Sequence, residues 1–194
     1  MGYWTIPNLL TYLRMICAFG VLFFGTQGRW DIGFPIFCIG ALTDMIDGSI
    51  ARILEQRTRI GGFLDPVADK LLMFFSLVAL TRTGYIPYGL TALILARDLF
   101  ISIGLIILKV KDVYIIFRPT YLSKFTTLLQ FITLLMAFLT TRKIGLTGNS
   151  SYVTLWSSVL GATALLTTLT GFQYAQIGAR MIHERSQETQ THRQ

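Results

Sequence analysis

Long apolar runs separated by short polar segments dominate the pattern of this 194-residue chain. Six helical spans can be drawn, and several of them reach the ~20 residues that a helix needs to cross a bilayer. Their approximate limits are 6–27, 32–54, 63–83, 88–109, 121–141 and 151–178. The pattern therefore predicts an all-α polytopic membrane protein with six transmembrane helices.

Glycine, proline and charged residues mark the breaks between these spans. The segment 109–120 carries basic residues among apolar ones and is expected to lie along the membrane interface. The polar residues 183–194 are expected to form a frayed tail. We therefore expect one membrane domain over residues 1–182, followed by this tail.

The composition separates this chain from soluble proteins. Apolar residues make up 53% and charged residues 14%, whereas soluble domains carry about 25% charged residues. A soluble protein with a large core is therefore disfavoured. The net charge of +7 comes largely from basic residues clustered in short loops, which favours contact with anionic lipids over a nucleic-acid partner.

The basic residues also predict an orientation. Ten lysines and arginines lie in the loops after the second and fourth spans and in the tail. The opposite side carries four, namely Arg29, Arg82, Arg142 and Lys143. The positive-inside bias then places both termini in the cytoplasm. The first residues lack the features of a signal or transit peptide, so we expect a mature multi-pass protein of a prokaryotic plasma membrane.

The two cysteines do not suggest chemistry. Cys17 and Cys38 both lie inside apolar runs and have no paired spacing. We expect them to be small packing residues rather than a disulfide or metal ligands.

Four aspartates interrupt the apolar pattern around the loop between the second and third spans. Asp44 and Asp47 lie at helical positions i and i+3, with Gly48 next on the same face. Asp65 and Asp69, one turn apart on the third span, also share a face. Because the loop is short, the two helices can lie antiparallel. The four carboxylates are then expected to meet near the cytoplasmic end of the bundle.

These carboxylates must be compensated inside a membrane. A central aspartate costs about 2.5–3.5 kcal/mol on insertion scales, so four facing lipid would cost roughly 10 kcal/mol or more. Shared protons, pairing with Lys70, Arg14 or Arg97, or two Mg²⁺ ions would offset this cost. The residues alone leave three functions open: metal-assisted phosphate chemistry, an ion or proton pathway, and a structural ion-pair cluster.

A longer motif narrows these functions. The pattern Asp44-x2-Asp47-Gly48-x2-Ala51-Arg52-x8-Gly61-x3-Asp65-x3-Asp69 resembles the signature of the CDP-alcohol phosphatidyltransferase family at all eight fixed positions. The N-terminal sequence PNLLTYLR resembles the first helix of that family, and the six-span layout covers essentially the whole chain. The resemblance implies a membrane enzyme and disfavours the ion pathway and the structural cluster.

The resemblance also implies a mechanism, a two-metal displacement on a pyrophosphate. The donor would be CDP-diacylglycerol, whose lipid-bearing phosphorus is attacked by an alcohol hydroxyl while CMP leaves. Asp44 and Asp65 would bridge two divalent cations, Mg²⁺ or Mn²⁺, with Asp47 and Asp69 each completing one site. Asp69 would also accept the proton of the hydroxyl, since a carboxylate within hydrogen-bond reach suffices as a base.

Five further residues resemble the family's contacts to the donor: Gly48, Arg52 and Thr58, with Asn8 and Thr11 from the first helix. The planar donor fork of Arg52 suits a phosphate group. Simpler roles stay open for some of them, with Arg52 as an interfacial anchor, Thr58 as a loop residue and Asn8 as a helix cap.

The acceptor is expected to differ within the family. Two subfamilies resemble the chain most: phosphatidylglycerophosphate synthases, which use glycerol 3-phosphate, and eukaryotic-type cardiolipin synthases, which use phosphatidylglycerol. Leu105 and Thr126 stand where the first group tends to carry cations. Because a phosphate monoester dianion requires several cations, their absence favours phosphatidylglycerol and an apolar groove beside the fourth and fifth spans. Inositol phosphate or serine stays open.

Three cations are expected on the acceptor side: Arg97, Arg118 and Lys124. Anchoring to lipid headgroups is their alternative role. Dimers are usual in the family, so a homodimer embedded among membrane lipids is a further expectation of the resemblance.

Overall fold

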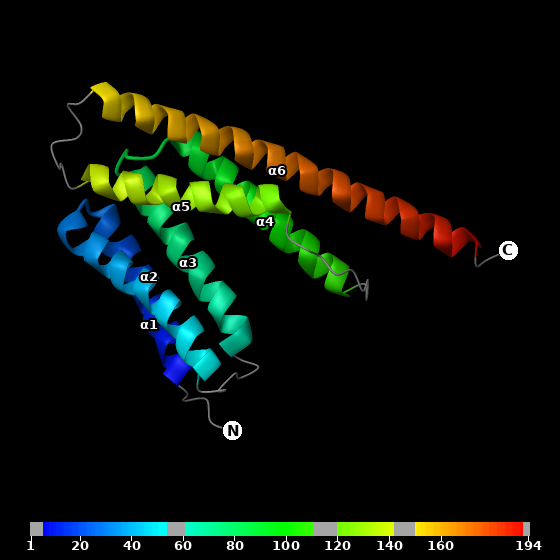
Figure 1. Ribbon diagram of the computed structural model, residues 1–194, viewed down its shortest axis with the longest axis horizontal. Coiled ribbons are helices and arrows are strands. Elements are labelled where there is room, and N and C mark those ends of the chain that lie inside the picture. The colour runs from blue at the N-terminus through cyan, green and yellow to red at the C-terminus, as the bar shows by residue number, and fades with distance from the viewer. Residues whose placement is uncertain (1–5, 54–60, 111–119, 142–149, 192–194) are drawn as a thin grey trace. The chain divides into compact units, whose positions relative to one another are not determined.

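The computed structural model describes the backbone of residues 6–53, 61–110, 120–141 and 150–191, and the side chains of 8–43, 64–104, 120–141 and 150–178. All elements in these ranges are helices (Figure 1). They are α1 Ile6–Thr26, α2 Trp30–Ile53, α3 Gly61–Arg82, α4 Tyr88–Val110, α5 Tyr121–Thr141 and α6 Ser150–Thr191. The predicted all-α class is confirmed, and the first five helices end within a few residues of the predicted spans.

Two details differ from the expected boundaries. Helix α3 begins at Gly61 and includes Pro66, whose missing N–H costs the helix one hydrogen bond. Helix α6 continues through Thr191, so the described part of the predicted frayed tail, residues 183–191, has a helical backbone. Polarity alone does not end a helix, and glutamate, glutamine and arginine are good helix formers. The predicted interfacial segment lies mostly outside the described residues.

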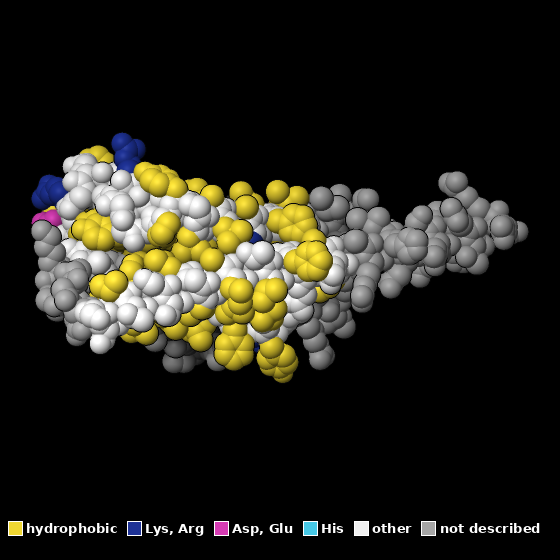
Figure 2. Space-filling view, turned by 90° about the horizontal axis from the view of Figure 1, so that it is seen from above, with side chains coloured by type: hydrophobic (Ala, Val, Ile, Leu, Met, Phe, Trp, Pro, Cys, Tyr) yellow, Lys and Arg dark blue, Asp and Glu magenta, His cyan; other side chains and the backbone are white. Residues whose placement is uncertain are grey.

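Three helical stretches in the described part of the chain are long and apolar enough to cross a membrane: Asn8–Thr26, Tyr121–Thr141 and Ser150–Gly178. Large apolar side chains are exposed along them, including Ile16 on α1 and Phe172 on α6. Figure 2 shows hydrophobic side chains spread over one face of the protein. These features are typical of a surface in contact with lipid. The count of six spans and the cytoplasmic termini stay predictions.

The chain forms two compact units, Met1–Thr91 with Leu134–Asn149, and Ala92–Thr133 with Ser150–Gln194. The predicted domain boundary at residue 182 stays a prediction.

In the first unit, α1 packs against both α2 and α3. A Cβ atom at Gly40 would lie 3.1 Å from Leu72 of α3 and 3.2 Å from the Cβ atom of Cys17 of α1. A glycine at this position therefore lets the three helices approach one another closely. Cys17 is buried in this contact, which agrees with the packing role predicted for it.

In the second unit, α5 and α6 are joined by a buried polar seam. The Thr133 and Thr163 hydroxyls are 2.7 Å apart, and Gln130 Nε2 donates to Thr167 Oγ1 at 3.3 Å. All four side chains are buried. Interhelical hydrogen bonds of this kind hold membrane helices together where the hydrophobic effect between them is weak.

Candidate active site

A stripe of buried polar residues runs along the N-terminal half of α1. Asn8, Thr11 and Arg14 are spaced three residues apart, and their exposed fractions are 3%, 0% and 0%. The same face continues into the apolar residues Cys17 and Val21. Polar groups this deeply buried require partners, and those of Thr11 and Arg14 come from α3.

The partners are the two carboxylates of α3. Thr11 Oγ1 donates a hydrogen bond to Asp65 Oδ1. Arg14 Nη1 lies 2.5 Å from Asp69 Oδ1, and the Asp69 side chain keeps 45% of its surface exposed. Because the two aspartates lie one turn apart, the two α1 residues reach them side by side. Arg14 is one of three residues predicted from the sequence to offset the charge of the four aspartates, and the structure pairs it with Asp69.

The end of α2 approaches the same place. Positions 40, 44 and 47 share one face of α2, and Gly40 on that face lies against Leu72 of α3. The positions of Asp65, Asp69 and Leu72 likewise share one face of α3. Helices α1 and α2 form an antiparallel hairpin, so the C-terminal part of α2 and the N-termini of α1 and α3 lie at the same end of the unit (Figure 1).

Several predicted site residues have no described side chain. Asp44, Asp47, Gly48 and Arg52 belong to helical backbone of α2, and their side chains lie outside the described residues. Thr58 and Arg118 also lie outside them. Their predicted roles in metal, donor and acceptor binding stay predictions.

The described residues fit divalent cations in chemical type. Asp65 and Asp69 offer the oxygen ligands that Mg²⁺ and Mn²⁺ prefer, and an ionised carboxylate has about four acceptor sites. No group of three or more acidic, histidine or cysteine side chains occurs among the side chains described. A complete site would therefore require Asp44 and Asp47. Arg14 supplies one fixed positive charge, so the carboxylates do not depend on metal ions alone for compensation.

Arg97 of α4 is the best-defined acceptor candidate. Its side chain is 9% exposed; Nη1 lies 2.7 Å from Asp98 Oδ1, and Nη2 donates to Ser123 Oγ of α5 at 2.7 Å. The guanidinium carbon also lies 5.9 Å from the centre of the Tyr174 ring of α6. Sequence reasoning missed Ser123 and Tyr174, because nothing in an apolar span marks which residues meet a distant arginine.

Two other acceptor-side predictions have different outcomes. Lys124 is exposed and its Nζ lies 5.7 Å from the centre of the Tyr121 ring. Thr126 is fully buried, donating to Leu122 O at 2.8 Å and contacting Leu166 O of α6 at 3.5 Å. The neutral residue at position 126 is thus explained by packing of α5 on α6. What Leu105 and Thr126 imply about the charge of the acceptor stays a prediction, and the side chain of Leu105 lies outside the described residues.

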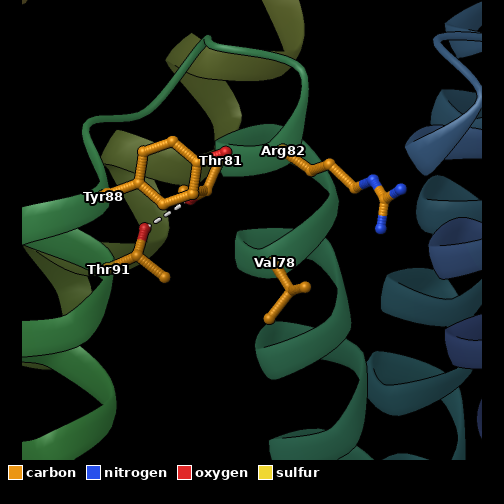
Figure 3. A pocket seen from close by; sticks show the side chains of 5 residues that line it. All are labelled: Val78, Thr81, Arg82, Tyr88 and Thr91. Carbon is orange, nitrogen blue, oxygen red and sulfur yellow. Dashed lines mark hydrogen bonds between the residues drawn. The ribbon is translucent and has the colours of Figure 1, made fainter.

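A separate pocket lies at the opposite end of α3 (Figure 3). It has a volume of about 370 Å³ and is lined by Val78, Thr81, Arg82, Tyr88 and Thr91. Thr81 donates to Leu77 O, so Thr91 is the donor in the 2.5 Å hydrogen bond between the two threonines. Thr81 follows Asp65 by 16 residues, or roughly 24 Å of helix. The pocket is therefore remote from the carboxylates.

Comparisons with known proteins agree with the motif. The model of the CDP-alcohol phosphatidyltransferase family matches residues 4–170. The CDP-diacylglycerol–glycerol-3-phosphate 3-phosphatidyltransferase of Cereibacter sphaeroides is 31% identical, over 88% of this chain and 94% of its own length. Human cardiolipin synthase (CMP-forming) is 29% identical, over 92% of this chain and 63% of its own length. The Escherichia coli CDP-diacylglycerol–glycerol-3-phosphate 3-phosphatidyltransferase is 43% identical over 50% of this chain and 56% of its own length.

Proposed function

The chain belongs to the CDP-alcohol phosphatidyltransferase family, and we propose that it transfers the phosphatidyl group of CDP-diacylglycerol to phosphatidylglycerol, forming cardiolipin and CMP. It is a helical membrane protein and a CDP-diacylglycerol-dependent phosphatidyltransferase. One observation carries the location of the chemistry: Thr11 and Arg14 of α1 hold Asp65 and Asp69 of α3. Membership of this family favours the enzyme over an ion or proton pathway.

On the donor side, Asp44, Asp47, Asp65 and Asp69 would hold two divalent cations. When bound, such cations stabilise the charge on the attacking and leaving oxygens of a displacement. Four carboxylates and Arg14 carry a formal charge of about −3, so two divalent cations leave about +1 for the diphosphate of the donor. Asn8, Gly48, Arg52 and Thr58 contact the donor. Thr11 belongs with them and, through its bond to Asp65, also orients that carboxylate.

Asp69 acts as the base. Its carboxylate takes the proton from a glycerol hydroxyl of phosphatidylglycerol. The oxygen of that hydroxyl then forms a bond to the lipid-bearing phosphorus of CDP-diacylglycerol. The bond between this phosphorus and the oxygen of CMP breaks, and CMP leaves with the electron pair. Arg14 holds Asp69 Oδ1, which restricts the carboxylate to a few orientations. The half-exposed Asp69 side chain is accessible to a substrate.

On the acceptor side, the charge around Arg97 favours phosphatidylglycerol. Asp98 already offsets the charge of Arg97 at 2.7 Å. A phosphodiester carries one negative charge, whereas a phosphate monoester carries about two near neutral pH. The following residues of α4, Leu99, Phe100 and Ile103, are apolar and exposed. They offer a surface for the acyl chains of a lipid acceptor. Arg118 and Lys124 complete the acceptor side.

Glycerol 3-phosphate is the second candidate acceptor. It is named for the Cereibacter sphaeroides relative, which this chain covers almost completely, and for the Escherichia coli relative. The asymmetry of basic residues further supports a multi-pass protein of a prokaryotic plasma membrane with its active site facing the cytoplasm. A homodimer also remains part of the proposal, on the family resemblance alone.

The test uses purified full-length protein with CDP-diacylglycerol and either phosphatidylglycerol or glycerol 3-phosphate. Lipid products are separated and identified by mass. We expect cardiolipin from the first pair and little phosphatidylglycerophosphate from the second. Efficient use of glycerol 3-phosphate with phosphatidylglycerol ignored would reject the proposed acceptor. No lipid product with either acceptor would reject both candidates.

A further inference from the structure

Three helices of the second unit meet at one guanidinium group. Arg97 comes from α4, Ser123 from α5 and Tyr174 from α6, and all three belong to the same compact unit. Tyr174 is 8% exposed and the Arg97 side chain 9% exposed. A cation buried to this degree in a membrane protein is unfavourable unless it is paired or serves a ligand.

The hydrogen bonds of Arg97 do not use all of its N–H donors. A guanidinium has five N–H donors. Nη1 is directed to Asp98 and Nη2 to Ser123, while the buried Nε has no hydrogen-bond partner in the described part of the chain. Buried donors without a partner are rare in proteins and call for an explanation. Nη1 and Nη2 each keep one further N–H that a bound anion can accept, because a guanidinium matches a phosphate through parallel hydrogen bonds.

We propose that Ser123 and Tyr174 are positioning residues that fix Arg97 for binding the phosphate of the acceptor, and that Asp98 lowers the charge of this subsite. The ligand class is a phosphoglycerol, of which phosphatidylglycerol and glycerol 3-phosphate are both examples. This inference rests on the proposed function, since it assigns Arg97 to the acceptor.

Each contact has a distinct part in holding the guanidinium. The Ser123 hydrogen bond fixes the rotation of the planar group about its long axis, and the Tyr174 ring covers its face. The α6 backbone at Gly171 lies beside the aliphatic part of the same side chain, since a Cβ atom there would be in ordinary van der Waals contact with Arg97 Cγ at 3.9 Å. Asp98 is 41% exposed beside Arg97, so its negative charge faces an incoming anion as well. It therefore disfavours a dianion more than a monoanion.

The test compares Ser123→Ala and Tyr174→Leu with matched controls. Thr127→Ala removes an exposed hydroxyl of α5, and Phe172→Leu removes an exposed aromatic ring of α6. The acceptor used is whichever the wild-type protein turns over. Loss of one hydrogen bond or one cation–π contact is expected to raise the acceptor KM by about three- to tenfold. The KM for CDP-diacylglycerol should stay within twofold, and the controls should resemble wild type.

A second pair of variants separates positioning from general structural damage. Tyr174→Phe keeps the ring over Arg97 and should restore the acceptor KM relative to Tyr174→Leu. Asp98→Asn should shift selectivity towards glycerol 3-phosphate over phosphatidylglycerol. Equal changes in both substrate KM values, or an unchanged acceptor KM in an active enzyme, would overturn the inference and leave the proposed function intact. A wild-type protein inactive with both acceptors would instead reject the proposed function.

Discussion

Arg14 of α1 is fully buried, and its Nη1 atom lies 2.5 Å from Oδ1 of Asp69 on α3, a carboxylate that is 45% exposed. The pair joins a buried cation to an anion that substrates can reach. The ion pair compensates the charge of Asp69 and restricts the orientation of its carboxylate. With Asp69 as the proposed base, α1 belongs to the proposed catalytic structure as well as to the bundle.

Replacing Arg14 should therefore affect both stability and turnover. Arg14→Ala removes the ion pair with Asp69. We expect it to lower the free energy of unfolding by about 1–3 kcal/mol, a value between those for exposed and for buried ion pairs. Arg14→Lys keeps the charge but loses the planar geometry. It should retain more stability than Arg14→Ala while still losing turnover. Denaturation in detergent and CMP release would measure the two effects, and full activity in Arg14→Ala would contradict the role of the pair.

Divalent cations should be required for turnover. The expectation follows from the oxygen ligands of Asp65 and Asp69 at the end of the unit that α2 also approaches. Exhaustive chelation should abolish CMP release, and Mg²⁺ or Mn²⁺ should restore it. CMP release that continues without divalent cations would remove them from the mechanism, whatever the acceptor.

The polar seam between α5 and α6 should contribute to stability but not to chemistry. Thr133→Val keeps the shape of the side chain and removes its 2.7 Å hydrogen bond to Thr163. The expected loss is about 0.6–1.7 kcal/mol, the range measured for hydrogen bonds between membrane helices. Thr127→Val, at an exposed position of α5, is the matched control. The free energy of unfolding would be measured in detergent. If Thr133→Val lowers it no more than Thr127→Val does, the seam is not stabilising.

The helices could be predicted well from the sequence, because apolar runs of membrane length end at glycine, proline and charged residues. Helix α6 is the exception, since its polar end is built from helix-forming residues and continues to Thr191. The four-residue spacing of Asp65 and Asp69 also predicted that they share one face of their helix. The positive charge of Arg14 suggested it as a partner for the aspartates.

The surroundings of Arg97 could not be predicted. Ser123 and Tyr174 lie 26 and 77 positions away along the chain. They contact Arg97 because of the way α4, α5 and α6 are rotated and packed against one another. The hydropathy pattern does not predict that packing. The same limit applies to Thr126, whose neutral side chain looked like a feature of the acceptor site. Its hydroxyl donates to Leu122 O within α5 and lies 3.5 Å from Leu166 O of α6.

The most direct test of the account is CMP release from CDP-diacylglycerol by wild-type protein and by Asp69→Asn, with the preferred acceptor present. Asp31→Asn, at the exposed start of α2, is the matched control because it makes the same change at the other end of the unit. The account predicts that Asp69→Asn loses roughly 10²–10⁴-fold in turnover, as expected for loss of a general base, while Asp31→Asn stays near wild type. Turnover of folded Asp69→Asn within tenfold of wild type would contradict the account.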